Sequence, residues 1–283
     1  MKVQLIDSIP ALREALGRHR RAGETIGLVP TMGALHAGHG SLIDHARRGC
    51  DVVVTSIFVN PIQFNQAADY NRYPRTLDAD LAFCEERGVD YVFAPSEREM
   101  YPAPLDAYVD VARLTDHLCG AFRPGHFRGV VTVVTKLLLI ALPDRAYFGE
   151  KDAQQLAVIQ RLVRDLNIPV EIMPVPIVRE PDGLALSSRN EHLTAHERRI
   201  ATVLYRGLRA AGEAVAAGAR NAREVSRAAL EVIATQPEVR VEYLEVVDPA
   251  EMQPVETIEG PVRVAVAAWV GNTRLIDNIL CRP

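Results

Sequence analysis

Lysine is scarce in this sequence of 283 residues. Of the 32 basic residues, only Lys2, Lys136 and Lys151 are lysines, so arginine is the usual cation. The ammonium group of lysine is a compact and movable point charge, whereas the guanidinium group of arginine is a planar fork. A lysine in a functional loop of this chain therefore indicates a need for a point charge. For Lys2 and Lys136 we prefer the simpler interpretation that their positions have no functional meaning, since the three lysines must lie somewhere in the chain.

Cysteine and long hydrophobic runs are also sparse. The longest apolar run, 137–143, is much shorter than the roughly 18 residues that a membrane span requires. Charged residues interrupt the N-terminal segment, which is not typical of a secretory signal. We therefore expect a cytoplasmic protein with no membrane partner and with reduced thiols. No metal-ligand spacing or CxxC pair is formed by the four cysteines, Cys50, Cys84, Cys119 and Cys281.

An excess of positive charge is absent as well. The formal net charge is −4, which provides no overall basic field to attract nucleic acid. We therefore expect no nucleic-acid partner. The net charge does not exclude a local basic pocket. The composition, with 48% hydrophobic and 24% charged residues, is that of an ordinary globular protein. The length favours two domains.

The first part of the chain alternates β-branched runs with segments of helical periodicity. Because strands that alternate with helices form βαβ units, this order predicts an α/β fold with a Rossmann-like, doubly wound parallel sheet. Such sheets bind ligands beyond the carboxyl ends of their strands. The predicted strands are 25–29, 51–58, 90–94, 145–148 and 170–175, and the predicted helices are 41–49, 77–88, 129–142 and 152–166.

The pattern changes after about Pro176. Asp182 and Gly183 indicate a hairpin, and Thr194–Glu197 has the form of a capping box. A long Ala- and Arg-rich helical region follows to about residue 234. We predict that residues 1–176 form the Rossmann-like domain and that residues 177–283 form a smaller C-terminal α+β domain. Its predicted strands are 241–247, 262–267 and 273–279.

The stretch Pro30–His39 lies between a predicted strand and the helix that follows. Gly33 and Gly38 permit tight turns and a close approach of the backbone to a ligand. The helix N-terminus offers unpaired N–H groups to phosphate. His36 and His39 are three residues apart, so both can donate to phosphoryl oxygens from one side. A metal pair lacks a third ligand at a recognised spacing, and a packing role leaves the glycines unexplained. We therefore favour a phosphate site.

The stretch Phe148–Gln155 again combines a strand end, a glycine and a helix start. Lys151 lies where the sheet should present its ligands, which favours a phosphate-directed cation over a solvated surface charge. Asp152 has an alternative role as a helix N-cap. Gln154 and Gln155 would be ordinary surface residues if Lys151 were not adjacent to them.

The stretch Leu186–Asn190 places two hydroxyl groups beside a guanidinium group. These donors suit phosphate oxygens, although Ser-Ser-Arg-Asn is also an ordinary polar loop. Its position after the predicted domain boundary indicates an element that closes over a site.

Two further loops are candidates for substrate contacts. Asn60 and Gln63 follow the second predicted strand, where they can meet a polar small molecule or belong to a plain solvated loop. Residues 123–128 concentrate Arg123, His126 and a second arginine before a helix. This set suits an anion, but a solvated basic loop is the commoner case.

Together these stretches resemble the pantothenate synthetase family of the nucleotidyltransferase superfamily, which carries a HIGH-type histidine motif and a KMSKS-like loop. The resemblance covers both predicted domains and follows the family's order. One departure is Leu186, where the family usually has Met; the exchange conserves bulk. The matching stretches are 30–39, 58–64, 73–76, 126–129, 148–155, 187–190 and 275–278.

The resemblance implies an AMP-forming ligase that joins pantoate to β-alanine in two steps. Pantoate and ATP give pantoyl adenylate and pyrophosphate, and the amine of β-alanine then displaces AMP. The resemblance also implies a homodimer, nucleotide and pantoate binding in 1–176, and Mg²⁺ bound with ATP. For Mg²⁺, Asp80 is the candidate ligand.

Residue roles also follow from the resemblance. The catalytic set is His39, His36, Lys151, Ser187, Ser188 and Arg189. ATP would contact this set and also Met32, Gly33, Ala34, Leu35, Ala37, Gly38, Gly149, Glu150, Asp152, Val178 and Leu186. By the resemblance, Gln63 and Gln155 would hold pantoate, and Gln63 would also face β-alanine. The two loops described above add Asn60, Arg123 and His126 to the substrate-binding set.

Three rival functions fit the residues less well. A nicotinamide-dependent oxidoreductase would show GxGxxG after the first strand with an acidic residue about 20 positions further on. An adenylyltransferase with a phosphorylated substrate would not need Gln63 and Gln155. A non-catalytic nucleotide-binding subunit would lack the phosphate donors. The sequence therefore favours the ligase.

Overall fold

The computed structural model describes residues 2–65 and 67–283, which divide into two compact units. The first unit runs up to Val111 and also contains Arg123–Glu150 and Val158–Pro176. The second unit consists of Ala112–Phe122, Lys151–Ala157 and Ile177–Pro283. The assignment of nucleotide and pantoate binding to residues 1–176 stays a prediction.

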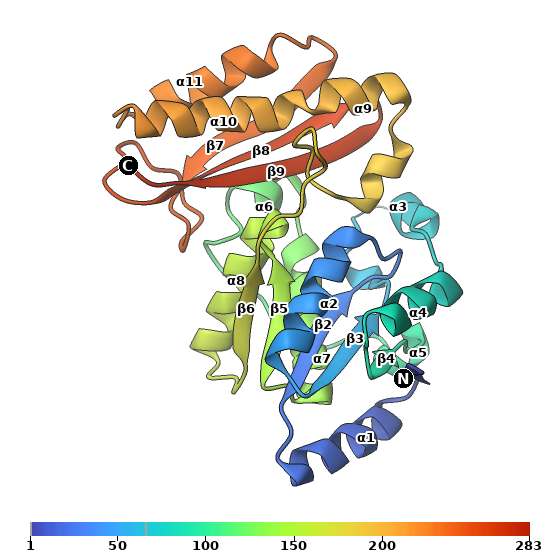
Figure 1. Cartoon of the computed structure of the whole chain (residues 1–283). Helices are drawn as coiled ribbons and strands as arrows, with labels where there is room; N and C mark the ends of the chain where they lie inside the picture. Colours follow the sequence, from blue (N-terminus) through green and yellow to red (C-terminus); the bar gives the residue numbers. More distant parts are fainter. Residues whose placement is uncertain (1, 66) are drawn as a thin grey trace. The chain divides into compact units, whose positions relative to one another are not determined.

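A six-stranded parallel sheet forms the centre of the first unit, and a three-stranded antiparallel sheet lies in the second (Figure 1). The predicted combination of a parallel α/β sheet with a smaller α+β part is confirmed. The sequence did not predict β1. In spatial order the parallel strands are β1 (Gln4–Ile6), β4 (Tyr91–Phe93), β3 (Val52–Ile57), β2 (Ile26–Thr31), β5 (Arg145–Gly149) and β6 (Glu171–Val175).

The strand order of this sheet reverses next to β2. From β2 the chain continues to β3 and β4 on one side, whereas β5 and β6 lie on the other side. In open α/β sheets, ligands bind outside the carboxyl ends of the strands at such a switch point. A ligand site is therefore expected at the loops that leave the carboxyl ends of β2 and β5. These loops contain the two predicted phosphate clusters that follow Thr31 and Gly149.

Helices cover the sheet of the first unit. Among them, α2 packs on β2, β3 and β5, while α7, which is largely apolar, packs on β2 and is buried on most sides. Two predicted helix starts are about one turn too late. They are residue 41 for α2, which begins at Ala37, and residue 129 for α7, which begins at His126. The bounds are α1 (Ile9–Ala22), α2 (Ala37–Gly49), η1 (Pro61–Gln63), α3 (Ala67–Arg72), α4 (Leu77–Glu86), α5 (Glu97–Met100), α7 (His126–Ala141) and α8 (Ala153–Asp165).

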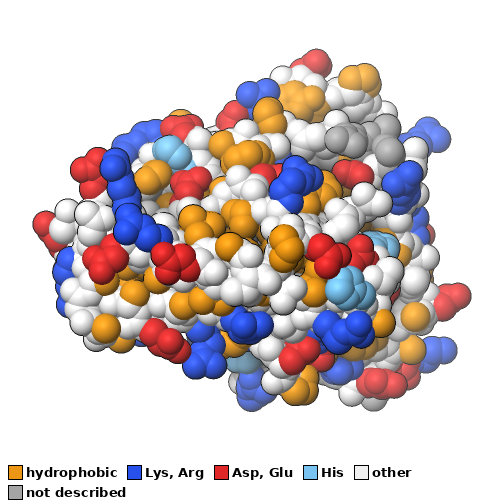
Figure 2. Space-filling view, turned by 90° about the horizontal axis from the view of Figure 1, so that it is seen from above, with side chains coloured by type: hydrophobic (Ala, Val, Ile, Leu, Met, Phe, Trp, Pro, Cys, Tyr) orange, Lys and Arg blue, Asp and Glu red, His pale blue; other side chains and the backbone are white. Residues whose placement is uncertain are grey.

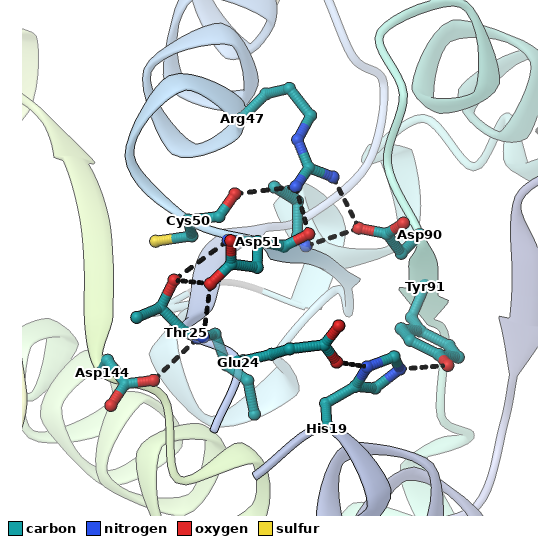
Figure 3. A network of polar contacts seen from close by, with 11 residues as sticks. His19, Glu24, Thr25, Arg47, Cys50, Asp51, Asp90, Tyr91 and Asp144 are labelled. Atoms are coloured by element: carbon teal, nitrogen blue, oxygen red, sulfur yellow. Dashed lines mark hydrogen bonds and ion pairs between the residues drawn. The ribbon is translucent and has the colours of Figure 1, made fainter. Parts of the chain in front are cut away.

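Carboxylates hold the amino ends of the parallel strands (Figure 3). Asp51 Oδ2 accepts from the backbone N–H of Thr25 at 2.9 Å and from its hydroxyl at 2.7 Å. Asp144 Oδ2 accepts from the N–H of Ile26 at 2.7 Å. Asp90 Oδ2 accepts an N–H of β3 and a guanidinium N–H at the same distance. The backbone N–H groups of Thr25, Ile26 and Val53 are thus satisfied by side chains of the same unit.

The second unit packs a helical layer against its antiparallel sheet. Helices α10 and α11 pack on each other, and α10 packs on β8 and β9. The predicted long helical region is interrupted at Gly218, where φ is +102°, and Asn221 caps the helix that follows. The bounds are α6 (Leu118–Phe122), η2 (Glu150–Asp152), η3 (Ser188–His192), α9 (Ala195–Ala201), α10 (Val203–Ala216), α11 (Ala222–Ile233), β7 (Val239–Val247), β8 (Val262–Val270) and β9 (Thr273–Cys281).

Two local predictions for this unit are confirmed. The hairpin around Gly183 is closed by an antiparallel bridge between Arg179 and Ala185. The capping box at Thr194 and Glu197 is formed in both directions. Figure 2 shows Lys and Arg side chains mixed with Asp and Glu side chains on the face drawn. Among the helices of residues 2–65 and 67–283, none combines the length and the hydropathy needed to cross a membrane.

Candidate active site

His36 and His39 form the amino-terminal cap of α2. His36 is the N-cap, and its Nδ1 accepts from the N–H of Gly38 at 3.1 Å. Nδ1 of His39 accepts from the N–H of His36 at 3.3 Å, and the two ring centroids are 4.2 Å apart. Because both Nδ1 atoms accept, each neutral ring carries its proton on Nε2. Capping thus fixes the tautomer in which Nε2 can donate to a phosphate oxygen.

The loop before this cap has an unusual backbone that Asp80 holds. Gly33 and Ala34 both have positive φ, +81° and +51°. The buried Asp80 carboxylate accepts from the N–H of Ala34 at 3.0 Å and from that of Leu35 at 2.8 Å. A Cβ at position 33 would lie only 3.0 Å from Asp80 Oδ2. Glycine is therefore required there by both the backbone and the close approach.

The proposed metal role of Asp80 does not fit this geometry. Both carboxylate oxygens already accept backbone N–H groups, and only 2% of the residue is exposed. Mg²⁺ keeps several waters and its ligands need space for them. Within the described part of the chain, no group of three or more His, Cys, Asp and Glu side chains could hold a metal ion. We therefore correct the sequence interpretation and identify Asp80 as the anchor of the histidine loop.

Gln63 is held by a network that includes Asn60, another predicted substrate residue. The Nδ2 of Asn60 donates to Gln63 Oε1 at 2.9 Å, and Asn60 Oδ1 accepts from the hydroxyl of Tyr101 at 2.7 Å. Gln63 Nε2 points to Met32 Sδ at 3.1 Å. Asn60 is 1% exposed, whereas Gln63 is partly exposed. We therefore interpret Asn60 as a residue that orients Gln63.

His126 supports the backbone of the same residue. Its Nδ1 lies 2.9 Å from the carbonyl oxygen of Gln63, which can only accept, so Nδ1 carries a proton. Nε2 lies 3.1 Å from Nη1 of Arg123, which can only donate, so Nε2 accepts and the ring is neutral. A Cβ at Gly129 would lie 2.6 Å from the Cα of Gln63. The start of α7 is thus built to approach η1 closely.

In the second unit, Lys151 follows β5 in η2. Its side chain is 18% exposed, and Nζ lies 3.8 Å from Asp152 Oδ2. The carbonyl oxygen of Lys151 accepts from Nδ2 of Asn278 at 3.0 Å. Gln154 is buried and donates to two backbone carbonyl groups at 2.8 Å, so it is structural, whereas Gln155 is partly exposed.

The serine loop, residues 186–190, lies in the second unit and runs into η3. Ser187 caps η3, and its Oγ accepts from the N–H of Arg189 at 3.3 Å, which leaves the hydroxyl proton available as a donor. The N–H of Leu186 donates to the carbonyl group of Val178 at 3.0 Å. Ser188 is partly exposed and Arg189 is exposed. The loop can therefore present hydroxyl and guanidinium donors to a phosphate group.

Three residues that make supporting contacts within their own units had no assigned role in the sequence prediction. Tyr101 orients Asn60, and burial raises the pKa of its phenol, so the hydroxyl stays a donor. Arg179 and Asp277 form a bidentate pair at 2.7 and 2.8 Å at the base of the hairpin. The sequence offered a signal only for Asp277, as part of the polar pair at positions 277 and 278 within an apolar strand.

Comparisons with known proteins agree on one family. The sequence profile described as Pantoate-beta-alanine ligase matches residues 4–280. A protein named pantothenate synthetase from Moorella thermoacetica is 53% identical over 278 residues, which are 98% of this chain and 98% of that protein.

Solved structures are similar over the whole length. The crystal structure of pantothenate synthetase from Thermus thermophilus has a TM-score of 0.94 and 48% identity, and the match covers 99% of this chain and 100% of that chain. The crystal structure of pantoate-beta-alanine ligase from Francisella tularensis, complexed with beta-gamma ATP and beta-alanine, has a TM-score of 0.82 and 37% identity. That match covers 98% of this chain and 97% of the other.

Proposed function

Because the chain belongs to the pantoate-beta-alanine ligase family, we propose that it ligates pantoate and β-alanine with ATP through a pantoyl adenylate. The observation that carries this proposal is the histidine pair at the amino end of α2. A helix N-terminus with two Nε2–H donors suits a reaction in which charge develops on phosphate oxygens. The complex of the Francisella tularensis ligase with an ATP compound and β-alanine supports both substrates.

The first proposed step is adenylation. A carboxylate oxygen of pantoate attacks the α-phosphorus of ATP. The bond from this phosphorus to the oxygen that bridges to the β-phosphate breaks, and pyrophosphate leaves with the electron pair. His36 and His39 donate to the phosphate oxygens from Nε2, which their Nδ1 contacts leave protonated. Fixed donors need no reorganisation when the charge develops, so they lower the barrier.

Lys151 and the serine loop supply further donors for the phosphates in this proposal. The ammonium group of Lys151 can follow a phosphate that moves during bond cleavage, because it has no fixed fork geometry. Ser187 and Ser188 donate through their hydroxyl groups, and Arg189 provides an exposed guanidinium group. We propose that the remaining ATP contacts lie in the residues around these donors, as the family resemblance implies.

The second proposed step is amide formation. The amine of β-alanine attacks the carbonyl carbon of the adenylate, the bond from that carbon to the AMP oxygen breaks, and the amine loses a proton. Gln63 is proposed to hold pantoate and to face β-alanine, because Asn60 and His126 fix both its amide and its backbone. Gln155 is proposed as the second pantoate contact. Preorganised contacts of this kind keep the reacting groups aligned.

Mg²⁺ enters this proposal only as part of the MgATP substrate. The ion usually binds through substrate phosphates with few protein carboxylates. This fits a protein whose one candidate ligand, Asp80, is committed to backbone N–H groups.

We also propose a homodimer and a cytoplasmic location, as expected from the sequence. Sedimentation at several protein concentrations tests the dimer.

The adenylate is tested with pantoate that carries ¹⁸O in its carboxylate. The attacking oxygen stays on phosphorus when the amine displaces AMP, so one ¹⁸O atom is expected in AMP. Pyrophosphate should form with ATP and pantoate alone, and AMP should appear only after β-alanine is added. Release of ADP, with ¹⁸O in inorganic phosphate, would show an acyl phosphate instead and would refute the proposal.

A further inference from the structure

Asn278 in β9 connects the buried interior of the second unit to Lys151. The residue is 2% exposed, and its Nδ2 donates to the carbonyl oxygen of Lys151 at 3.0 Å. Its Oδ1 accepts from Nη1 of Arg263 on β8. Its backbone N–H donates to Asp277 Oδ1 at 2.7 Å. A buried amide is therefore used on both of its polar atoms and on its backbone.

Arg263 determines which way this amide points. A guanidinium group only donates and a carbonyl oxygen only accepts, so Oδ1 must face Arg263 and the NH₂ group must face Lys151. Arg263 is 7% exposed, and a charged donor makes a stronger hydrogen bond than a neutral one. Arg263, on the neighbouring strand of the sheet, thus fixes the orientation in which the amide of Asn278 donates to the backbone of Lys151.

The backbone is the part of Lys151 that a protein can fix. The ammonium group sits on a flexible four-carbon stem, so its reach depends on where the stem begins. Lys151 lies in the short η2 turn between β5 and α8. An anchor on its carbonyl group holds this turn at the lysine itself.

We propose that Asn278, oriented by Arg263, is a positioning residue for Lys151 in adenylate formation. This inference rests on the proposed function, in which Lys151 binds the phosphates of ATP. A misplacement of about 1 Å can cost a factor of about 100 in rate, so loss of the anchor is expected to slow adenylation by about 10-fold or more. The KM for β-alanine should not change, because Lys151 is not assigned to the second step.

Asn278→Asp is the most direct test. The carboxylate keeps an acceptor for Arg263 but places an oxygen, instead of an NH₂ group, against the carbonyl group of Lys151. Asn278→Ala, which removes both contacts, is measured beside it. The matched control is Asn221→Asp in the same unit, because aspartate caps a helix as well as asparagine does. Single-turnover formation of pyrophosphate from ATP and pantoate is measured for each folded variant.

A double-mutant cycle with Lys151→Ala identifies the path of the effect. If Asn278 acts through Lys151, the loss caused by Asn278→Asp should disappear in the Lys151→Ala background. Equal losses in both backgrounds, or a normal rate for Asn278→Asp and Asn278→Ala in the wild-type background, would overturn the positioning role alone. A normal rate for Lys151→Ala would instead overturn the role proposed for Lys151, and the positioning of its side chain with it.

Discussion

The carboxylate of Asp80 accepts the backbone N–H of Leu35 at 2.8 Å, across 45 positions of sequence. The other carboxylate oxygen accepts from Ala34, whose φ of +51° is unfavourable for a residue with a Cβ. Such a conformation costs on the order of 1 kcal/mol and persists where neighbouring contacts enforce it. A buried carboxylate on α4 thus shapes the loop that leads into the histidine cap.

Asp80→Asn is expected to lower the free energy of unfolding by about 1–3 kcal/mol, because one backbone N–H loses its acceptor in a buried place. The KM for ATP should rise as the loop relaxes. The Mg²⁺ concentration that gives half of the maximal rate should stay as in the wild type. Denaturant unfolding, an ATP titration and a Mg²⁺ titration measure these three quantities. Unchanged stability together with a tenfold weaker Mg²⁺ dependence would restore Asp80 as a metal ligand.

Lys151→Arg preserves the charge at this position but changes its shape. Because a planar fork cannot occupy the place of a small ammonium group, we expect turnover to fall by about 10-fold or more, equivalent to about 1.4 kcal/mol of barrier. Steady-state turnover and the thermal midpoint are compared with those of the wild type. Lys2→Arg, at an exposed position, serves as the matched control. Equal turnover of both variants would mean that Lys151 is an ordinary surface charge.

The carboxylate of Asp51, at the amino end of β3, makes the free energy of unfolding depend on pH. The hydroxyl of Thr25, and then its backbone N–H, lower the pKa of Asp51 below the usual 3.8. A group with a lowered pKa in the folded state stabilises the fold above the unfolded pKa. This contribution should therefore be complete above pH 3.8 and be lost as the pH falls through the lower, folded pKa.

Asp51→Asn isolates this effect, because the amide retains an acceptor but does not titrate. The wild type should be the more stable protein at neutral pH, and the difference should shrink as the pH falls below 3.8. The midpoints of urea unfolding of both proteins are measured between neutral pH and about pH 2. A difference that does not vary with pH would contradict the assignment.

The alternation of strands and helices was readable from the sequence because parallel strands buried on both faces form continuous β-branched runs. Val52–Ile57 is such a run. Gln4–Ile6 was not readable, since it is a short edge strand with two exposed residues. The start of α2 was placed too late because His36 is not among the usual N-cap residues, and only its hydrogen bonds reveal it.

The sequence singles out candidate site residues where residue type and position coincide, as for Lys151 after a strand end, and the phosphate role of Lys151 stays a prediction. The site was not predictable where a polar side chain serves another residue. Asn60 follows a strand in the same way as Gln63, and only its 1% exposure and its contact with Tyr101 separate the two roles. Contacts between distant parts of the chain carry this information, and a local motif does not contain it.

His39 caps α2 and is also the proposed phosphate donor, and substitution can separate these two roles. Nδ1 caps α2 by accepting the N–H of His36, while Nε2–H is the proposed phosphate donor. The side chain of asparagine places an acceptor near the position of Nδ1 and has no group at the position of Nε2. His39 is the N3 residue of a capping box, in which the N3 side chain reaches back to the backbone N–H of the N-cap residue.

We therefore expect His39→Ala to lose both functions and His39→Asn to lose only one. Alanine should lower the free energy of unfolding by about 1 kcal/mol through the missing cap, whereas asparagine should retain most of it. Both variants should form pyrophosphate from ATP and pantoate about 100-fold more slowly, which is the scale of a positioned donor. Thermal midpoints and single-turnover rates on the same samples check this. A normal rate in His39→Asn would show that the cap, and not the donor at Nε2, is what adenylation requires.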